Sequence, residues 1–447
     1  MTIQNQLKSS PWFQIVLPLV FFIGGLSIIN WYGCFEFDPD EGINLIKAFL
    51  LNRDYQLYQD IWNDQPPLLT YLLSWWFKLF ETNVDLARIL ILLCSTILLW
   101  QTWLVLYLLG GVLHAYIGCL FLLIAPNYWK LSVSVMVGLP CITLALGALL
   151  SIILWHKTYK RRWLIVSALL LSLSVLTKLF TFFIAPIILG GIICDCAARN
   201  SKADRFKLIK TASWYHKLQL PALWLIIFSG FSLLILILLV GIDNIDLLVN
   251  NHTSARTTEA FQDMTLGRSV KNDYRLFLIG FTIWGSIIAC KRQQWQILYF
   301  AAWSSIAYWL LINHRPIWYH QVLLLQVPAI IMVGYALGNI INTAVYSGRT
   351  YFRFNLRIIL TFFTVVVFYC AILLIGEQTK TTYKEINHWS KACNSDIIST
   401  SHEQQFLTAI EQSSQPSDWL VTDSPIFAFR AGMAVPPPTA VLSRKQL

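Results

Sequence analysis

The sequence predicts an all-α integral membrane protein, and its composition and the placement of its charges are the observations behind that prediction. Of its 447 residues, 56% are hydrophobic and only 13% are charged, whereas about 25% of residues are charged in a typical soluble domain. The charges lie in short clusters between apolar runs of roughly 20 residues, the length that spans a bilayer core. Because lipid offers no hydrogen bonds to an open backbone, each run is expected to form a helix.

About eleven spanning helices are predicted from these runs. They are expected over residues 11–31, 86–110, 112–127, 138–156, 163–178, 180–196, 219–241, 275–290, 295–313, 320–341 and 356–376. The first run is longer than the apolar core of a signal peptide and no small-residue cleavage site follows it, so we expect it to be retained as a span.

Clusters of lysine and arginine predict the orientation. Four such clusters fall on one side of the membrane if the N-terminus is cytoplasmic, and they occupy residues 157–162, 199–217, 291–292 and 349–357. The net charge of +10 is therefore assigned to loops that face anionic lipid, not to nucleic-acid binding. The opposite side receives three longer segments, 32–85, 242–274 and 377–447.

Most of the nine cysteines lie inside apolar runs, where a free cysteine behaves as a small hydrophobic residue. Only Cys34 and Cys393 fall clearly on the outer side, so one disulfide between them is possible without any wider disulfide framework. Cys194 and Cys196 have no second pair of ligands nearby in the sequence, which argues against a zinc site.

An acidic motif, residues 37–42, follows the first span directly. It contains Asp38, Asp40 and Glu41. Carboxylates at a membrane boundary are costly unless they are solvated or used. Taken alone, a solvated acidic loop explains this motif as well as a functional site does.

A second motif, residues 58–68, favours the functional interpretation. It places Asp64 just before a Pro-Pro pair that begins a short apolar helix. Proline suits the first helical turn, whose free N–H groups could help to bind an anion. Two short helices are expected here, lying in the membrane interface, over 43–53 and 67–80.

Together these motifs resemble the first outer loop of the GT-C glycosyltransferases, in the branch of protein O-mannosyltransferases and aminoarabinose transferases (glycosyltransferase family 39). The resemblance rests on Asp-Glu-Gly at 40–42, a helix, and Tyr-x-Asp-x-Trp-x-Asp-Gln-Pro-Pro-Leu at 58–68. Weaker matches follow in order at Thr177 with Lys178, at His252, at 314–320 with Val327 and Pro328, and at 418–438.

The resemblance covers most of the chain and implies a GT-C fold with interfacial helices in the first outer loop. It divides the chain into a transmembrane catalytic domain, 1–376, with outer loops 32–85 and 242–274, and a short extracytoplasmic segment, 377–447, that looks truncated. Two departures stand out. Gln65 replaces the lysine of the aminoarabinose branch, and 130–142 contains no carboxylate.

The reaction implied by the resemblance transfers a sugar from a polyprenyl-phosphate donor to a hydroxyl or amine of an acceptor. Attack on the anomeric carbon needs a base, and the leaving phosphate needs positive charge. Asp40 is expected to be that base or to orient the acceptor, with Glu41 and Asp64 in support. Glu41 could equally cap the following helix. A divalent metal ion held by Asp64 and His252 is left open, and no other cofactor is expected.

Donor phosphate is expected to bind Lys178, Arg268 and Arg315, because arginine and lysine are the usual phosphate ligands. A lysine whose charged end reaches the membrane surface is the alternative for Lys178. Contacts with the sugar or the lipid are expected from Trp62, Gln65, Trp318, Tyr319 and His320. The alternatives are an interfacial aromatic belt and structural histidines.

Two other classes of function stay open. A transporter or lipid flippase would line its pathway with charges deep inside several spans, and the sequence shows few of them. A non-catalytic GT-C-like protein would keep the fold without the activity. The expected partners are the lipid-linked donor, a lipid, glycan or protein acceptor, and membrane lipids. The expected location is the plasma (inner) membrane, with the C-terminus outside.

Overall fold

The computed structural model describes residues 11–28, 34–204, 214–254, 264–346, 372–373, 375–388, 391, 393, 402–415 and 417–441. Helices account for all of the regular elements in these ranges. The long helices of the bundle are α2 (Pro11–Ile28), α5 (Val84–Gly110), α6 (Val112–Leu123), α8 (Gly138–Thr158), α9 (Arg161–Thr177), α10 (Ile184–Asp204), α11 (Trp214–Val240), α14 (Asn272–Lys291), α15 (Leu298–Asn313) and α16 (Leu323–Tyr346).

Shorter helices connect or cover the bundle. They are α3 (Pro39–Leu51), α4 (Leu68–Leu79), α7 (Tyr128–Val133), α12 (Ile245–Ser254), α13 (Leu266–Ser269), α19 (His402–Ser413) and α20 (Pro425–Arg430), with the 3-10 turns η1 (Leu179–Phe183), η3 (Trp295–Ile297), η4 (Tyr319–Val322) and η6 (Pro437–Thr439).

The chain is a multi-pass membrane protein. Each predicted span from 11–31 to 320–341 coincides with a helix to within a few residues, in three cases with a leading 3-10 turn. In the described part of the chain, seven helices are long and apolar enough to cross a membrane. The remaining predicted span, 356–376, lies almost entirely outside the described residues.

Burial separates the centre of the bundle from its lipid-facing surface. The apolar stretches of α8 and α16 are 89% buried, whereas that of α11 is 17% buried. The first two therefore pack on protein on nearly all sides, and α11 presents most of its leucine and isoleucine side chains outward, as a helix in contact with lipid does.

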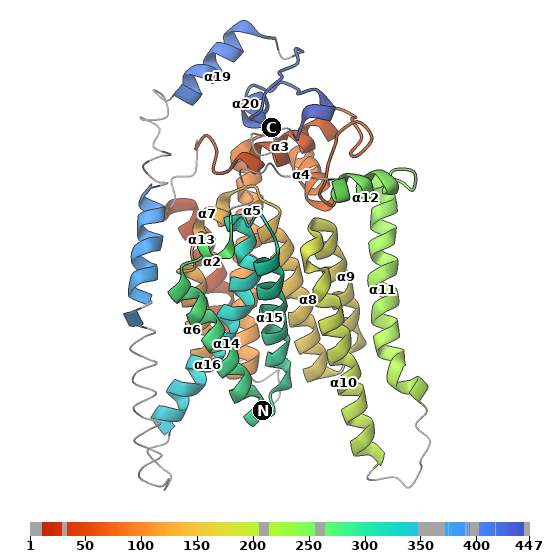
Figure 1. Cartoon of the computed structure of the whole chain (residues 1–447), viewed down its shortest axis with the longest axis vertical. Coiled ribbons are helices and arrows are strands. Elements are labelled where there is room, and N and C mark those ends of the chain that lie inside the picture. The colour runs from red at the N-terminus through yellow and green to blue at the C-terminus, as the bar shows by residue number, and fades with distance from the viewer. Residues whose placement is uncertain are drawn as a thin grey trace.

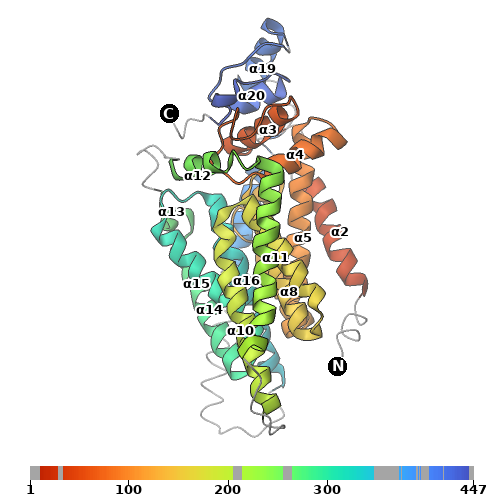
Figure 2. The same ribbon diagram turned by 90° about the vertical axis from the view of Figure 1, so that its right-hand side faces the viewer.

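The two ends of the bundle differ in the charges of their residues. One end, here called the acidic end, carries α3, α4, α12 and α20, while the described basic residues of 157–162 and 291–292 lie at the opposite, basic end (Figures 1 and 2). These two clusters thus share one side, as predicted. The other two, 199–217 and 349–357, fall largely or wholly outside the described residues.

Helix α3 begins four residues earlier than the predicted start at 43. Asp38 is its N-cap and accepts a hydrogen bond of 2.9 Å from the backbone N–H of Asp40, and Pro39 occupies the first helical position. Both residue types favour a helix start at these positions. Asp40 and Glu41 therefore lie in the first turn of a helix and not in a loop before it.

The C-terminal segment covers α3, so this helix is not simply an interfacial helix. Most of the α3 side chains are buried, and α20 packs against them. The Arg430 guanidinium donates to the backbone carbonyls of Cys34 (2.5 Å) and Phe35 (2.8 Å). A disulfide joins Cys34 to Cys393, which confirms the pairing that the sequence left possible.

Gly42 allows this close packing, and Gly42→Ala is expected to loosen it. An added Cβ would lie 2.6 Å from the backbone nitrogen of Ile426, and backbone cannot yield as a flexible side chain can. Overpacking of this kind costs about 1–3 kcal/mol. A protease should therefore cleave residues 417–441 of the variant at a lower protease concentration than is needed for the wild type.

Gly230→Ala is the matched control, since a Cβ there meets no atom within 4 Å. Alanine in the middle of that helix should leave proteolysis unchanged or slow it slightly. Equal protection of the C-terminal segment in the Gly42 variant would show that α3 and α20 do not pack as described.

Candidate functional site

Asp38 joins three parts of the chain at the acidic end. Besides capping α3, its carboxylate accepts a hydrogen bond of 2.8 Å from the Tyr319 hydroxyl. The ring of Tyr319 in turn lies under the Lys130 ammonium, with Nζ 4.1 Å from the ring centroid. The loop before α16 and the short helix α7 are thereby held against the start of α3.

Asp40 and Asp64 face the same two cations. Both carboxylates lie within electrostatic range of Lys47 and of Lys178. Asp64 is held in place by Gln65, whose side-chain amide donates to it over 3.1 Å. The acidic motif and the Pro-Pro motif, separated by about twenty residues, therefore both act electrostatically on two lysines, one in α3 and one at the end of α9. That the two carboxylates share one cavity stays a prediction.

Lys47 is a further candidate residue of the site that was not expected from the sequence. Its side chain is 2% exposed, and Nζ donates to the side-chain oxygen of Asn63 over 2.9 Å. Asn63 is itself fixed, because its amide donates 2.6 Å to the carbonyl of Gln65. The missed signal was spacing: a lysine seven residues after Asp40 lies on the same face of a helix.

Burial lowers the pKa of Lys47 from 10.5 to about 8, against the opposing influence of Asp64 and then Asp40. The unfolded chain therefore binds one more proton than the folded chain between pH 8 and 10.5, so stability should rise with pH through that window. At about 1.4 kcal/mol per pKa unit, the full rise is about 3 kcal/mol. Thermal unfolding between pH 7.5 and 10.5 measures it.

Lys47→Met should lose this part of the pH dependence, whereas Lys78→Met should keep it. Lys78 is exposed in the last turn of α4 and serves as the matched control. Identical slopes of melting temperature against pH in both variants would contradict the prediction that Lys47 is a buried lysine that loses its proton in this pH range.

The contacts of Glu41 indicate a structural role for this carboxylate. Its carboxylate is completely buried and pairs with Arg88 through contacts of 2.8 and 2.9 Å. It also accepts from the backbone N–H groups of Phe37 (3.0 Å) and Val135 (3.2 Å). Four hydrogen bonds occupy both oxygens, so Glu41 positions the acidic motif. The cap expected of Glu41 is made by Asp38 instead.

Lys178 is the predicted phosphate ligand that lies within electrostatic range of Asp40 and Asp64. It is half-buried at the end of α9, with Nζ 5.2 Å from the centroid of the Phe180 ring. The His314 ring packs against the same phenyl group at 5.3 Å. Arg315 is exposed, and the described residues offer it no ion pair. The side chain of Arg268 lies outside the described residues.

The residues expected to contact sugar or lipid divide into two groups. Trp62, Trp318 and Tyr319 are half-buried near the acidic end, so part of each ring is accessible. His320 is only 5% exposed and packs beside Tyr319 at the start of α16, an environment that favours a structural role for it. Gln65 holds Asp64.

The His252 imidazole does not contact the Asp64 carboxylate, with which it was expected to hold a metal ion. His252 reaches Asp64 through its backbone, with Nδ1 2.7 Å from the carbonyl oxygen. Among the described side chains, no group of three or more histidine, cysteine, aspartate or glutamate residues could hold a metal ion. The metal site therefore stays a prediction, and no step below depends on it.

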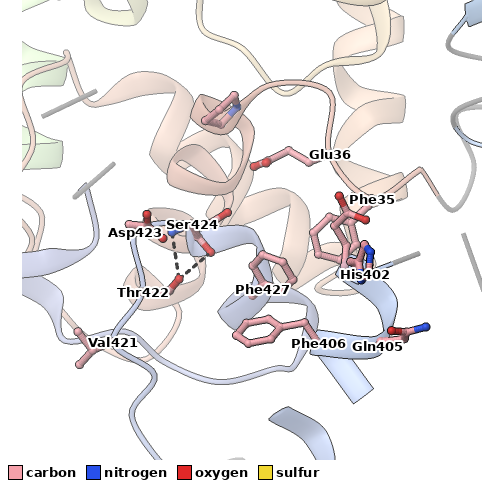
Figure 3. A pocket seen from close by; sticks show the side chains of 12 residues that line it. Phe35, Glu36, His402, Gln405, Phe406, Val421, Thr422, Asp423, Ser424 and Phe427 are labelled. Carbon is pink, nitrogen blue, oxygen red and sulfur yellow. Dashed lines mark hydrogen bonds between the residues drawn. The ribbon is translucent and has the colours of Figure 1, made fainter. Parts of the chain in front are cut away.

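A cavity of about 1080 Å³ opens beside the acidic motif. Figure 3 shows side chains that line it, among them Phe35 and Glu36 from the acidic motif's side of the chain and His402, Phe406 and Phe427 from the C-terminal segment. Burial, followed by the negative charges of Glu41 and Asp38, raises the pKa of Glu36 to about 8. At pH 7 this wall therefore presents a neutral carboxylic acid together with aromatic rings.

Comparison with solved structures identifies the fold. The chain matches ArnT from Cupriavidus metallidurans bound to undecaprenyl phosphate with a TM-score of 0.59, covering 96% of this chain and 86% of that one at 13% identity. It matches the oligosaccharyltransferase AglB from Archaeoglobus fulgidus, in complex with an inhibitory peptide and a dolichol-phosphate, with a TM-score of 0.53, covering 96% and 60% at 11% identity. The chain has the GT-C fold.

A family model supports the same placement within the GT-C proteins. Residues 64–231 match the model described as dolichyl-phosphate-mannose-protein mannosyltransferase. The match begins at Asp64 and includes Lys178, whereas Asp40 and Lys47 lie before it. Comparison with curated proteins gives no significant match.

Proposed function

We propose that this GT-C protein is a membrane glycosyltransferase that transfers a sugar from a polyprenyl-phosphate donor to an acceptor on the extracytoplasmic face. One observation carries the proposal: Asp40 and Asp64, from two separate motifs, both lie within electrostatic range of Lys47 and Lys178 at the acidic end of the bundle. This arrangement supplies both requirements of the reaction, a base and positive charge for a leaving phosphate.

The reaction follows from these groups. Asp40 accepts the proton of the acceptor hydroxyl or amine as its oxygen or nitrogen bonds to the anomeric carbon. The bond from that carbon to the phosphate oxygen breaks, and the lipid phosphate leaves with the electron pair. Lys178, which is half-buried, stabilises the leaving phosphate. Lys47 is buried against Asn63 and positions the two carboxylates.

The cavity beside the acidic motif is the proposed binding place of the acceptor. The cavity of about 1080 Å³ includes Pro39, the residue between Asp38 and Asp40, in its wall. Aromatic rings and carboxyl groups such as Phe427 and Glu36 suit a molecule with alternating apolar faces and hydroxyl groups. A lipid, glycan or protein with a free hydroxyl or amine could therefore approach Asp40 from this side.

The orientation belongs to the same proposal. The acidic end faces the extracytoplasmic side of the plasma (inner) membrane, and the basic loops 157–162 and 291–292 face the cytoplasm. The disulfide between Cys34 and Cys393 supports this side for the acidic end, because disulfides persist in oxidising compartments.

Transfer in detergent solution tests the function and separates it from transport. The purified chain is mixed with undecaprenyl-phosphate mannose or aminoarabinose and an acceptor extract from its own cells, and labelled products are identified by mass spectrometry. Detergent micelles have no two sides, so a flippase would give no product. Absence of transfer from every donor, with unchanged lipid-linked sugars in cells lacking the chain, would contradict the proposal.

Lys178→Gln tests the donor site within that assay. Loss of a charged partner of phosphate costs about 1.5–3 kcal/mol, which corresponds to a decrease in kcat/KM on the order of 10- to 100-fold. The exposed Lys78→Gln is the control, with an expected change below twofold. A Lys178 variant as active as the control would limit that lysine to a membrane-surface role.

A further inference from the structure

A second cavity, of about 320 Å³, lies at the basic end of the bundle. It forms where α5 ends and α6 begins, and α8, α16 and the link after α14 supply its other walls. Its volume is about ten times the 30 Å³ that a water molecule occupies in the liquid. The whole length of α5 separates it from the Arg88–Glu41 pair at the acidic end, so it does not belong to the site described above.

The charges in this cavity are positive. Lys157 and Arg292 line it and no carboxylate does, and neither cation has an ion-pair partner among the residues that the structure describes. Lys157 donates one hydrogen bond, 2.5 Å to the carbonyl of Leu108, and an ammonium has three donors. Arg292 makes a single long contact of 3.5 Å with the Thr343 hydroxyl. Several N–H donors are left for a ligand.

A buried histidine lines the same cavity. His114 is 2% exposed, and neither of its ring nitrogens makes a hydrogen bond of normal geometry, the side chain of Asn339 being a weak partner beside it. In either neutral tautomer the imidazole carries one N–H donor, and a buried donor without a good partner is costly. A ligand with an acceptor oxygen in the cavity would remove that cost.

The fold makes room for this ring with two glycines. A Cβ at Gly110, in the last turn of α5, or at Gly338, in α16, would lie 2.4 Å from the imidazole Cδ2. Two helices that are distant in sequence therefore leave the volume that the ring of His114 needs. The position of the imidazole is fixed by this packing and not by hydrogen bonds.

The end of α5 is the one feature that opposes an anion here, because the C-terminus of a helix carries partial negative charge. Two carbonyls of its last turn are already bonded: Leu108 accepts from Lys157, and Leu109 accepts from the Gln294 side chain over 3.3 Å. A bound cation would instead meet Lys157 and Arg292 directly.

From these contacts we propose that the cavity binds a phosphate group, through Lys157, Arg292 and His114, on the side of the membrane opposite to the transfer site. Lysine and arginine form charge-assisted hydrogen bonds with phosphate oxygens, and the histidine supplies a neutral donor. The phosphate is either that of a lipid headgroup in the adjoining leaflet or a soluble phosphate.

Thermal unfolding of the full chain in nanodiscs distinguishes these sources. A ligand of the folded state raises the melting temperature in proportion to the logarithm of its concentration once that exceeds Kd. In discs of a galactolipid, which carries no phosphate, inorganic phosphate is added in increasing concentration. In a second series without free phosphate, phosphatidic acid replaces part of the galactolipid. A rise only in the second series assigns the site to lipid headgroups, and a rise in the first assigns it to soluble phosphate.

Two variants tie the effect to the cavity. Arg292→Gln should weaken binding on the order of tenfold, since one charge-assisted contact is lost, while the exposed Arg292 side chain leaves folding intact. His114→Phe keeps a ring of similar size and should also reduce the shift. Lys291→Gln removes the same charge from an exposed neighbouring position and should bind as the wild type does.

Two results would overturn the proposal. One is the absence of any rise in melting temperature in both series. The other is an equal loss of the shift in the Lys291 and Arg292 variants, which would indicate general attraction of anions to a basic surface. Both results are independent of sugar transfer, so they leave the proposed enzymatic function untouched.

Discussion

Asp40→Asn is expected to lower the rate of sugar transfer by roughly 10²- to 10⁴-fold, the usual contribution of a general base. Asparagine has nearly the same shape, but its amide cannot accept the proton of the acceptor. The start of α3 should survive the change, because the cap is made by Asp38 to the backbone N–H of residue 40. The loss should therefore be in kcat, with an unchanged amount of folded protein.

Asp54→Asn is the matched control for that experiment. Asp54 lies in the same outer loop, is exposed, and has a φ of 67°, a conformation that asparagine adopts as readily as aspartate. Its transfer rate should stay within twofold of the wild type. Normal turnover by the Asp40 variant would remove this residue from the mechanism and would leave Asp64 as the candidate base.

Arg88→Met is expected to destabilise the protein by about 3–5 kcal/mol, the cost of leaving a buried charge without its partner. Arg88 is fully buried, and its guanidinium also donates 2.8 Å to the carbonyl of Cys34. Without it, Glu41 would keep a buried carboxylate that only two backbone N–H groups contact. Thermal or denaturant unfolding in detergent should show the loss before any activity is measured.

A double variant separates the charge from the packing in this experiment. Glu41→Gln combined with Arg88→Met removes both charges, and a buried pair replaced on both sides is often close to neutral. The double variant should therefore be more stable than Arg88→Met alone. If it is equally unstable or worse, the destabilisation comes from the other contacts of Arg88, which are its packing, its hydrogen bond to Cys34 and its 3.2 Å ion pair with Asp85, and not from the unpaired Glu41 carboxylate.

The spanning helices follow from the sequence because apolar runs of the required length are a local property. The two acidic motifs were found for the same reason, since each lies within a short stretch. The start of α3 was predicted too late, because Pro39 and Asp38 were assigned to a loop although they make a favourable first helical position and cap.

Partners that are distant in the sequence could not be predicted in the same way. Glu41 pairs with Arg88, 47 positions further on, and nothing in either motif specifies how α3 and α5 approach each other. A charged residue in the first turn of a predicted spanning helix was nevertheless a signal, because such residues are costly without a partner. Lys47 was missed because the apolar residues around it suggested only an interfacial helix.

The contacts of α20 with α3 have a consequence for biogenesis. Residues 417–441 are synthesised after the spans that the structure describes, and they cross to the acidic side last in that part of the chain. The start of α3 is covered only when Ile426 packs on Gly42 and Arg430 binds the carbonyls of Cys34 and Phe35. In the proposed orientation this covering is completed only after the segment has crossed the membrane, which makes its late translocation a step in the assembly of the protein.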